Sequence, residues 1–395
     1  MRPVGIYIQV PFCQTKCTYC NFHTGVAPRA AYAPYARAVE REIRDWRAMF
    51  ATAHLESAAS LESAFVDTIY LGGGTPSLFD PADLARILEA VRTQFACADA
   101  GREVTLEADP ETITPEKAAA WLAAGVNRIS LGAQSFHDAE LKATGRLHRR
   151  ADIFSAIAQL RSKGFDNITL DLIAGLPHQT APSWQDSVEE ALRLRPEHIS
   201  IYLFEIDEGS RLGRELLAGG TRYSAAAVPT DDAMADSYEF ACERLSRTGY
   251  DHYEISNWAL PGFRSRHNLK YWRREPYLGF GAGAHSFDGH WRWANAHDPA
   301  AYAAAIEQAR LPVEQLEEVT PKQALNEELF LGLRQLEGID LAPIEAQYRA
   351  QINADIGARI EELRAQGLVE RSGSRVRLAS ARLAVSNEVF VALLD

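Results

Sequence analysis

Apolar runs and amphipathic stretches alternate along the first two thirds of the chain. Short apolar runs bounded by polar residues or glycine predict buried strands, and longer stretches with apolar residues three and four positions apart predict helices. Strands are predicted at 4–10, 66–71, 103–108, 128–132, 168–173 and 198–204. Helices are predicted between them, near 30–52, 81–95 and 115–124. Repeated strand–helix units of this length imply parallel strands joined by right-handed crossovers.

A partly closed barrel accounts for these units better than an open sheet with helices on both faces. Polar or glycine-rich segments follow the predicted strands directly, at the end where α/β barrels build their sites. The predicted fold class is therefore α/β, with a partial (β/α) TIM-like barrel. Residues 54–63 are predicted to form a surface insertion without chemical function.

The pattern changes after about residue 312. Helical periodicity at 321–336 and 353–366 is followed by Gly367 and two short strand-like runs. A helix that ends in glycine before a hairpin is typical of a winged helix. Its acidic helices favour packing or partner docking over DNA binding. The chain is predicted to divide into a barrel domain and a winged-helix-like α+β domain, 1–312 and 313–395.

Composition narrows the functional classes. Hydrophobic residues make up 47% and charged residues 24% of the 395 residues, as in soluble globular proteins, and the net charge of −12 argues against nucleic acid as a general partner. No transmembrane segment and no signal peptide are expected. Five cysteines, three of them clustered, fit a reducing cytoplasm. Cys97 and Cys242 are predicted to be ordinary small residues in helices.

The most informative segment is the loop after the first predicted strand, which holds Cys13, Cys17 and Cys20. Three thiolates on one loop can bind three irons of a [4Fe–4S] cube, which takes four cysteines when fully ligated. The fourth iron then stays open to a small molecule, as the open position of a catalytic zinc site does. The alternatives are a zinc site with a fourth ligand such as His23, and a disulfide, which needs an oxidising compartment.

The CX3CX2C spacing after a strand resembles the signature of radical S-adenosylmethionine (SAM) enzymes, and Tyr19 before the last cysteine also fits. In that family the three cysteines hold a [4Fe–4S] cluster, and the amino and carboxylate groups of SAM bind the open iron. The resemblance therefore implies a cluster and SAM as cofactors, with Cys13, Cys17 and Cys20 as the iron ligands.

Further motifs resemble the coproporphyrinogen oxidase-like branch of this family over the whole chain. Gly72-Gly73-Gly74-Thr75-Pro76 follows the second predicted strand, where glycines let a loop pass close to a ligand; a tight turn is the alternative. The later motifs are Glu107-Ala108-Asp109-Pro110, Gly132-Ala133-Gln134-Ser135-Phe136, Gly145-Arg146 and Asp171-Leu172-Ile173-Ala174-Gly175-Leu176-Pro177. The resemblance implies a set of cofactor-binding residues: Tyr7, Tyr19, Gly73, Gly74, Thr75, Glu107, Gln134, Arg146 and Asp171.

The charges in this set suit SAM. Glu107 and Asp171 can accept hydrogen bonds from an ammonium group or from ribose hydroxyls, and Arg146 can pair with a carboxylate. The alternatives are that the carboxylates cap the following helices and that Arg146 is an exposed charge.

A second motif, His267-Asn268-Leu269-Lys270-Tyr271-Trp272, resembles the HNXXYW element of the haem chaperones within this branch. Imidazole is a common axial ligand of haem iron, and aromatic rings offer a flat apolar surface. Basic residues around the motif can pair with the haem propionates: Arg264, Arg266, Lys270, Arg273 and Arg274. Segment 264–274 is therefore predicted to bind haem through His267. The alternative is a hydrogen-bonded histidine packed against the barrel wall.

Within the branch the resemblance favours a haem chaperone. Oxygen-independent coproporphyrinogen III dehydrogenase has a longer N-terminal region and a further cysteine two residues after the third, whereas here twelve residues precede Cys13 and Phe22 takes that position. The run Ser386-Asn387-Glu388-Val389-Phe390 also resembles the chaperones.

The predicted function is to bind haem, one [4Fe–4S] cluster and SAM, and to pass haem to acceptor apo-proteins. Respiratory enzymes at the membrane are one class of acceptor, which implies a cytoplasmic protein that can lie at the inner membrane face. The alternative is the dehydrogenase, which carries out an oxidative decarboxylation by radical SAM chemistry. The sequence leaves open whether the protein is an enzyme, whether SAM is cleaved, which residues would be catalytic and which protein accepts the haem.

Overall fold

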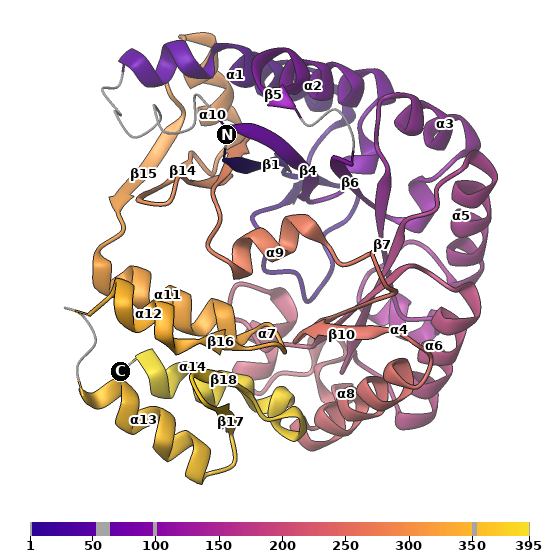
Figure 1. Cartoon of the computed structure of the whole chain (residues 1–395). Helices are drawn as coiled ribbons and strands as arrows, with labels where there is room; N and C mark the ends of the chain where they lie inside the picture. Colours follow the sequence, from indigo (N-terminus) through magenta and orange to yellow (C-terminus); the bar gives the residue numbers. More distant parts are fainter. Residues whose placement is uncertain (1, 53–63, 98–100, 350–353, 395) are drawn as a thin grey trace.

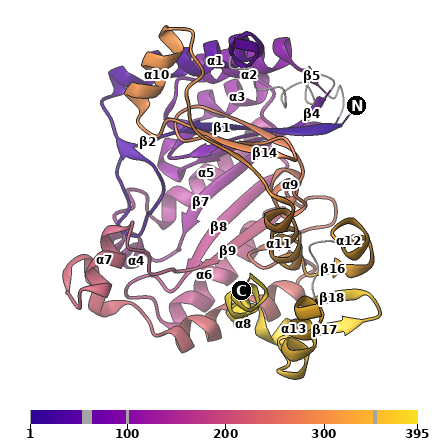
Figure 2. The ribbon, with the colours of Figure 1, turned by 90° about the vertical axis from the view of Figure 1, so that its left-hand side faces the viewer.

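The computed structural model describes residues 2–52, 64–97, 101–349 and 354–394, so the predicted insertion at 54–63 lies outside the described residues. Parallel strands form the centre of the molecule (Figures 1 and 2), in the order β9-β8-β7-β6-β4-β1. Their bounds are β1 Pro3–Val10, β4 Phe65–Gly73, β6 Glu103–Ala108, β7 Arg128–Gln134, β8 Ile168–Ala174 and β9 His198–Leu203. Every predicted strand is therefore present.

Helices cover the outer side of this sheet (Figure 1). They are α1 Tyr32–Thr52, α2 Pro81–Gln94, α3 Pro115–Ala123, α5 Arg150–Lys163, α6 Ala181–Leu194 and α8 Asp231–Ser246. Two short helices, α4 Asp138–Ala143 and α7 Arg211–Leu217, lie instead at the end of the molecule that carries the cysteine loop (Figure 2). Cys242 lies in α8 as predicted, but the prediction that Cys97 lies in a helix is wrong. Cys97 belongs to the short strand β5 (Ala96–Cys97), which pairs with β4.

Further strands extend the sheet at both edges. β11 (Asn257–Ala259) pairs antiparallel with β9, and β10 (Asp251–Glu254) pairs antiparallel with β11. At the other edge, β12 (Tyr277–Phe280) pairs parallel with β1. β13 (His285–Phe287), β14 (Trp291–Asn295) and β15 (Val313–Glu318) follow antiparallel, and α10 (Pro299–Glu307) lies between the last two in sequence. Within the described ranges the strand order runs from β10 to β15 without joining. The predicted partial barrel is confirmed.

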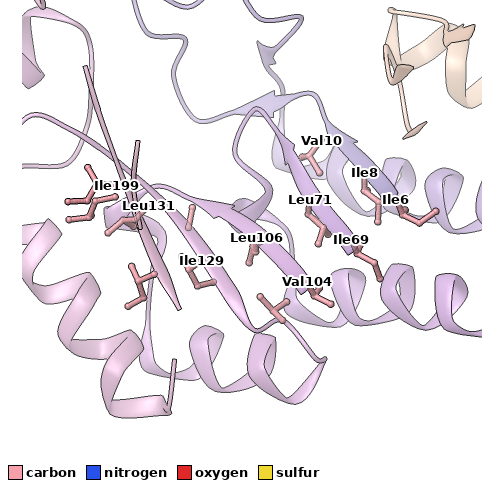
Figure 3. Packing of buried hydrophobic residues seen from close by; sticks show 14 of the residues in the cluster. Ile6, Ile8, Val10, Ile69, Leu71, Val104, Leu106, Ile129, Leu131 and Ile199 are labelled. Atoms are coloured by element: carbon pink, nitrogen blue, oxygen red, sulfur yellow. The ribbon is translucent and has the colours of Figure 1, made fainter. Parts of the chain in front are cut away.

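Alternation along the parallel strands separates a helix-facing side from an inner side. Aliphatic side chains on the helix-facing side are fully buried and share one core cluster with residues of α1 and α2. Figure 3 labels Ile6, Ile8, Val10, Ile69, Leu71, Val104, Leu106, Ile129, Leu131 and Ile199. Full burial of one such side chain contributes about 1.5–3 kcal/mol. The inner side carries the intervening polar and aromatic residues, among them Tyr7, Tyr70, Glu107, Ser130 and Asp171.

Helix α9 (Arg266–Trp272) packs inside the barrel near the starting ends of the strands (Figure 1). The Glu103 carboxylate accepts hydrogen bonds from the backbone N–H groups of Arg266 and His267, at 3.1 and 3.0 Å. These orphan N–H groups at a helix start need such an acceptor. A Cβ atom at Gly5 would lie 2.9 Å from Cδ of Lys270, so glycine allows the helix to approach β1 closely. Helix α9 therefore fills the barrel near the starting ends of the strands. Space for a ligand remains on the side of α9 that faces the carboxyl ends of the strands.

The C-terminal region has the predicted helix-and-hairpin pattern. Its elements are α11 Pro321–Leu333, β16 Ile339–Asp340, α12 Leu341–Gln347, α13 Ala354–Ala365, β17 Val369–Ser372, β18 Arg375–Leu378 and α14 Ser386–Leu394. The predicted boundary at 312–313 needs correction, because β15 pairs with β14 and so belongs to the barrel sheet. The N–H of Ile255 donates to the carbonyl oxygen of Arg334 at 3.1 Å, which ties the barrel edge to this region.

No helix in the part of the chain that the structure describes is both long enough and apolar enough to cross a membrane.

Candidate functional site

A cavity of about 670 Å³ opens at the carboxyl ends of the parallel strands, within the usual size range of small-molecule sites. The structure brings most of the predicted cofactor residues to its wall: Cys13, Cys17, Tyr19, Cys20, Gly73, Gly74, Thr75, Glu107, Gln134, Arg146 and Asp171. The other walls come from α9 and the C-terminal region, through Asn268, Tyr271, Trp272, Arg334, Ser386 and Asn387. Tyr7 and His267 are not on the wall.

The glycine run fixes the cysteine loop. The N–H of Gly74 donates to the carbonyl oxygen of Val10 at 2.7 Å, and that of Thr75 to the carbonyl oxygen of Phe12 at 2.8 Å. A Cβ at position 74 would lie 2.5 Å from the Phe12 carbonyl oxygen, and Gly73 has a φ of +109°. Both glycines line the cavity. The groups that they approach closely, however, belong to the protein and not to a ligand, since a Cβ at position 73 would meet Gln9.

The cysteine thiols are partly buried and form no disulfide. Burial raises the pKa of Cys13 to about 11 and also raises the pKa of Cys17, which the Arg146 guanidinium in turn lowers. No set of three or more His, Cys, Asp or Glu side chains in the described ranges is arranged around a single metal ion. A cube instead bonds its cysteines to separate irons. Three thiols on one loop beside a ligand-sized cavity therefore fit a [4Fe–4S] cluster.

Two half-buried carboxylates, Glu107 and Asp171, give this end of the cavity an acidic wall. Glu107 accepts hydrogen bonds from the Tyr70 hydroxyl at 2.8 Å and the Gly73 N–H at 3.0 Å, and Asp171 accepts one from the Ser130 hydroxyl at 2.9 Å. Burial raises the pKa of Glu107 to about 7, the Tyr70 bond lowers it and the Asp171 charge raises it again. Burial also raises the pKa of Asp171. Neither carboxylate caps a helix, and the arrangement favours a cationic ligand.

Arg146 is buried rather than exposed. Its Nη2 donates to the carbonyl oxygen of Gly132 at 2.7 Å and pairs with Asp109, while its Nη1 lies 3.7 Å from Sγ of Cys17. The predicted carboxylate partner is thus supplied by the protein itself. Arg146 links the rim of the barrel to the cysteine loop.

Gln134 is held in an unusual backbone conformation. It is the last residue of β7, where the register with β8 shifts between Gly132 and Gln134, and its φ is +64°. A bulge at a strand end re-aims a side chain, and strained residues of this kind are concentrated at functional sites. The conformation supports a ligand-binding role for Gln134.

His267 lies beneath the cavity wall and is 1% exposed. Its Nδ1 is 2.9 Å from the Thr68 hydroxyl and its Nε2 is 3.0 Å from the Tyr271 hydroxyl. Burial, with a smaller contribution from Lys270, lowers its pKa to about 3, so the ring is neutral. The alternative of a packed, hydrogen-bonded histidine describes its state here. The motif faces the cavity through Asn268, Tyr271 and Trp272 instead.

The basic residues of segment 264–274 are already paired within the protein. Lys270 is buried and lies 2.9 Å from Asp67, Arg264 pairs with Asp251 and Glu337, Arg266 with Asp67, and Arg274 with Glu327. Arg273 donates to Gln335. Gln335 is neutral, so four of the five positive charges of this cluster are compensated by carboxylates and the charge of Arg273 is not. This pairing argues against the cluster as a whole as the site of the haem propionates.

Sequence reasoning missed Glu254, Asn257 and Arg334, which line the cavity. Glu254 stands in the mostly polar stretch Asp251-His252-Tyr253-Glu254-Ile255-Ser256-Asn257, which gives no signal of a buried carboxylate. Nothing local to Arg334 in the sequence indicates that it reaches the barrel.

Comparisons with known proteins agree with these motifs. The model of the Radical SAM superfamily matches residues 7–191, and that of the HemN C-terminal domain matches residues 319–381. The chain is 33% identical to the haem chaperone HemW of Bacillus subtilis over 98% of both chains. It is 35% identical to HemW of Mycobacterium tuberculosis, covering 100% of this chain and 95% of the relative. The structure of coproporphyrinogen III oxidase HemN from Escherichia coli superposes with a TM-score of 0.83, at 22% identity, over 99% of this chain and 90% of that one.

Proposed function

The chain belongs to the HemW family of the radical SAM superfamily, and on this premise we propose that it is a haem chaperone that also carries a [4Fe–4S] cluster and SAM. One observation carries the proposal for this chain. Asn268, Tyr271 and Trp272 of the HNXXYW motif stand on the wall of the same cavity as the three cysteines. Haem would lie against this aromatic wall. The similarity to HemN, at 22% identity, shows a shared fold and gives no support for an oxidase activity in this chain.

Cys13, Cys17 and Cys20 would hold the cluster, which when bound supplies an open iron for the amino and carboxylate groups of SAM. Glu107 and Asp171 would orient the positive charges of SAM, since both are half-buried hydrogen-bond acceptors on the wall. Gln134 would offer an amide from the bulge. Tyr7 supports this layer from below, because its hydroxyl donates to Gln9 at 2.7 Å and its ring centroid lies 6.0 Å from that of Tyr70.

Replacing Glu107 by glutamine is expected to weaken SAM binding roughly tenfold to hundredfold, the usual effect of losing a hydrogen bond to a charged group. Because the pKa of Glu107 is raised to about 7, the carboxylate ionises as the pH rises through this value. The advantage of the wild type over the variant should therefore grow with pH. Asp171→Asn should weaken binding in the same way, and exposed Glu89→Gln on α2 is the control. Equilibrium binding of SAM that is unchanged in both rim variants would show that these carboxylates do not contact it.

The chaperone function is tested with haem and with the dehydrogenase substrate. We expect the purified protein to develop a Soret band on titration with haem and to pass that haem to an apo-protein. With coproporphyrinogen III, SAM and a reductant we expect no protoporphyrinogen IX. Formation of that product would assign the protein to the dehydrogenase class. Transfer to respiratory enzymes at the membrane is a further proposal, for which those apo-enzymes are the acceptors to use.

His267→Ala is expected to weaken haem binding while the cluster remains. The substitution removes the ring that joins Thr68 on β4 to Tyr271 on the cavity wall, so the aromatic wall loses its support. The position of the Soret band then reports the iron ligand. A shifted band would mean that His267 leaves Tyr271 and coordinates the iron, and an unshifted band would mean that it acts through the wall. Haem affinity equal to that of the wild type and of the exposed His290→Ala control would contradict both roles.

A further inference from the structure

Buried polar atoms without hydrogen-bond partners gather at the end of the cavity next to the C-terminal region. Among the described residues, Oε2 of Glu254, Oδ1 of Asn257, Nε1 of Trp272 and Nε of Arg334 all lack a partner. All of these residues line the cavity. A buried polar group left unpaired destabilises the folded protein, so this combination indicates a place for a polar ligand group.

Glu254 and Asn257 provide the fixed part of this subsite. They are 0% and 2% exposed, and the Asn257 amide donates to Oε1 of Glu254. The Ser256 N–H donates to the same oxygen at 3.1 Å. These bonds hold the carboxyl group in place through Oε1 and leave the buried Oε2 without a hydrogen-bond partner. Since β10 and β11 form a hairpin at the barrel edge, the two side chains are carried on a rigid element.

Arg334 and Trp272 provide two N–H donors. The Arg334 guanidinium lies 4.5 Å from the centre of the Trp272 ring, and its Nη2 lies 3.9 Å from Oε2 of Glu254. That separation allows charge attraction but is too long for a hydrogen bond. The backbone of Arg334 is tied to Ile255. The guanidinium therefore stands beside the cavity with its Nε–H group unused.

We infer that Glu254, Trp272 and Arg334 form a subsite for a carboxyl group of the ligand, and, given the proposed function, for one haem propionate. One carboxyl oxygen shares a single proton with Oε2 of Glu254. The other accepts from the N–H groups of Trp272 and Arg334. This arrangement satisfies both donors and Oε2, whereas an apolar ligand edge would leave all three unpaired. The cationic partner of the propionate is thus Arg334 of the C-terminal region and not the cluster at 264–274, most of whose charges are compensated.

Haem and its dimethyl ester test this subsite, because the ester keeps the ring and the iron but has no ionisable carboxyl groups. We expect the wild type to bind haem more tightly than the diester. Trp272→Phe retains an aromatic side chain, although a smaller one, and removes the Nε1–H donor. The smaller ring costs haem and the diester the same apolar contact, so the lost donor should appear as a further weakening of about tenfold for haem over the diester. Arg334→Met should act in the same direction. Trp258→Phe is the matched control, because Trp258 is buried away from the cavity wall.

These binding measurements test the carboxyl subsite and the haem-chaperone proposal separately. Equal weakening of haem and diester by Trp272→Phe, or no weakening of either, would overturn the carboxyl subsite. So would a loss of SAM affinity with haem binding intact, since the subsite would then belong to SAM. A wild type that binds haem and diester equally would overturn only the subsite. A wild type that binds neither would overturn the haem-chaperone proposal itself, and the subsite with it.

Discussion

Replacing Cys13, Cys17 or Cys20 by serine is expected to leave the purified protein without its iron–sulfur cluster. Each thiolate bonds a separate iron of the cube, and with one iron already open to SAM there is no spare cysteine on the loop. Serine keeps the shape of the side chain but is a poor ligand for iron. The wild type reconstituted without oxygen should contain about four irons and four sulfides per chain, and each variant should contain almost none.

Cys242→Ser is the control for this experiment. Cys242 lies in α8, away from the cavity wall, so its replacement should leave the iron content unchanged. Binding of SAM is the second measurement, since the open iron contributes to it. A Cys17→Ser protein with a full set of irons would mean that another residue completes the site, and the assignment of the ligands would be wrong.

The elements around this loop could be predicted because local pattern and site chemistry agree there. Short stretches rich in β-branched and aromatic residues, such as 66–71, favour strands. Alternation along a strand then places the intervening polar residues on the face opposite the helices. Glu107 and Asp171 follow this rule, whereas the bulge before Gln134 interrupts the alternation. The spacing of the cysteines then identifies the open end of the barrel. The sequence was sufficient to predict those site residues whose position follows from the order of the strands.

Prediction was weaker wherever a residue's role depends on a partner distant in sequence. Lys270 and Arg274 look like available cations until Asp67 and Glu327 are placed beside them. His267 looks like a ligand until its nitrogens are seen facing Thr68 and Tyr271. Charge compensation and burial are properties of the folded surface, and no spacing along the chain encodes them.

The subsite around Glu254 could not be predicted for a related reason. It forms only where the chain after α11 pairs with the barrel edge, which brings Arg334 to Trp272 across a long separation in sequence. A different pairing, that of β15 with β14, extends the barrel sheet to Glu318, beyond the predicted boundary at 312–313. The cavity is therefore a joint product of both regions.

Arg146→Met is expected to lower the free energy of unfolding by about 3 kcal/mol, the lower end of the range for breaking a buried ion pair. The side chains of Arg146 and Asp109 are 9% and 22% exposed, so methionine fills the volume but leaves a largely buried carboxylate without its cation. The Gly132 carbonyl oxygen also loses a donor. Denaturant unfolding of the cluster-free protein measures the effect. Cluster loading should fall as well, because Nη1 of Arg146 lies beside Sγ of Cys17.

The double variant Arg146→Met/Asp109→Asn separates loss of the pair from loss of packing. Asparagine removes the uncompensated charge and can still accept from the Thr75 hydroxyl, which lies 3.1 Å from Asp109. If the stranded charge is the cause, the double variant should be more stable than Arg146→Met alone, and the two substitutions will be strongly non-additive. If the losses in stability of the single variants Arg146→Met and Asp109→Asn simply add in the double variant, Arg146 stabilises the rim through its contacts with Gly132 and Cys17. Its ion pair with Asp109 then does not contribute. The ion pair would then have no part in holding the cysteine loop against the barrel.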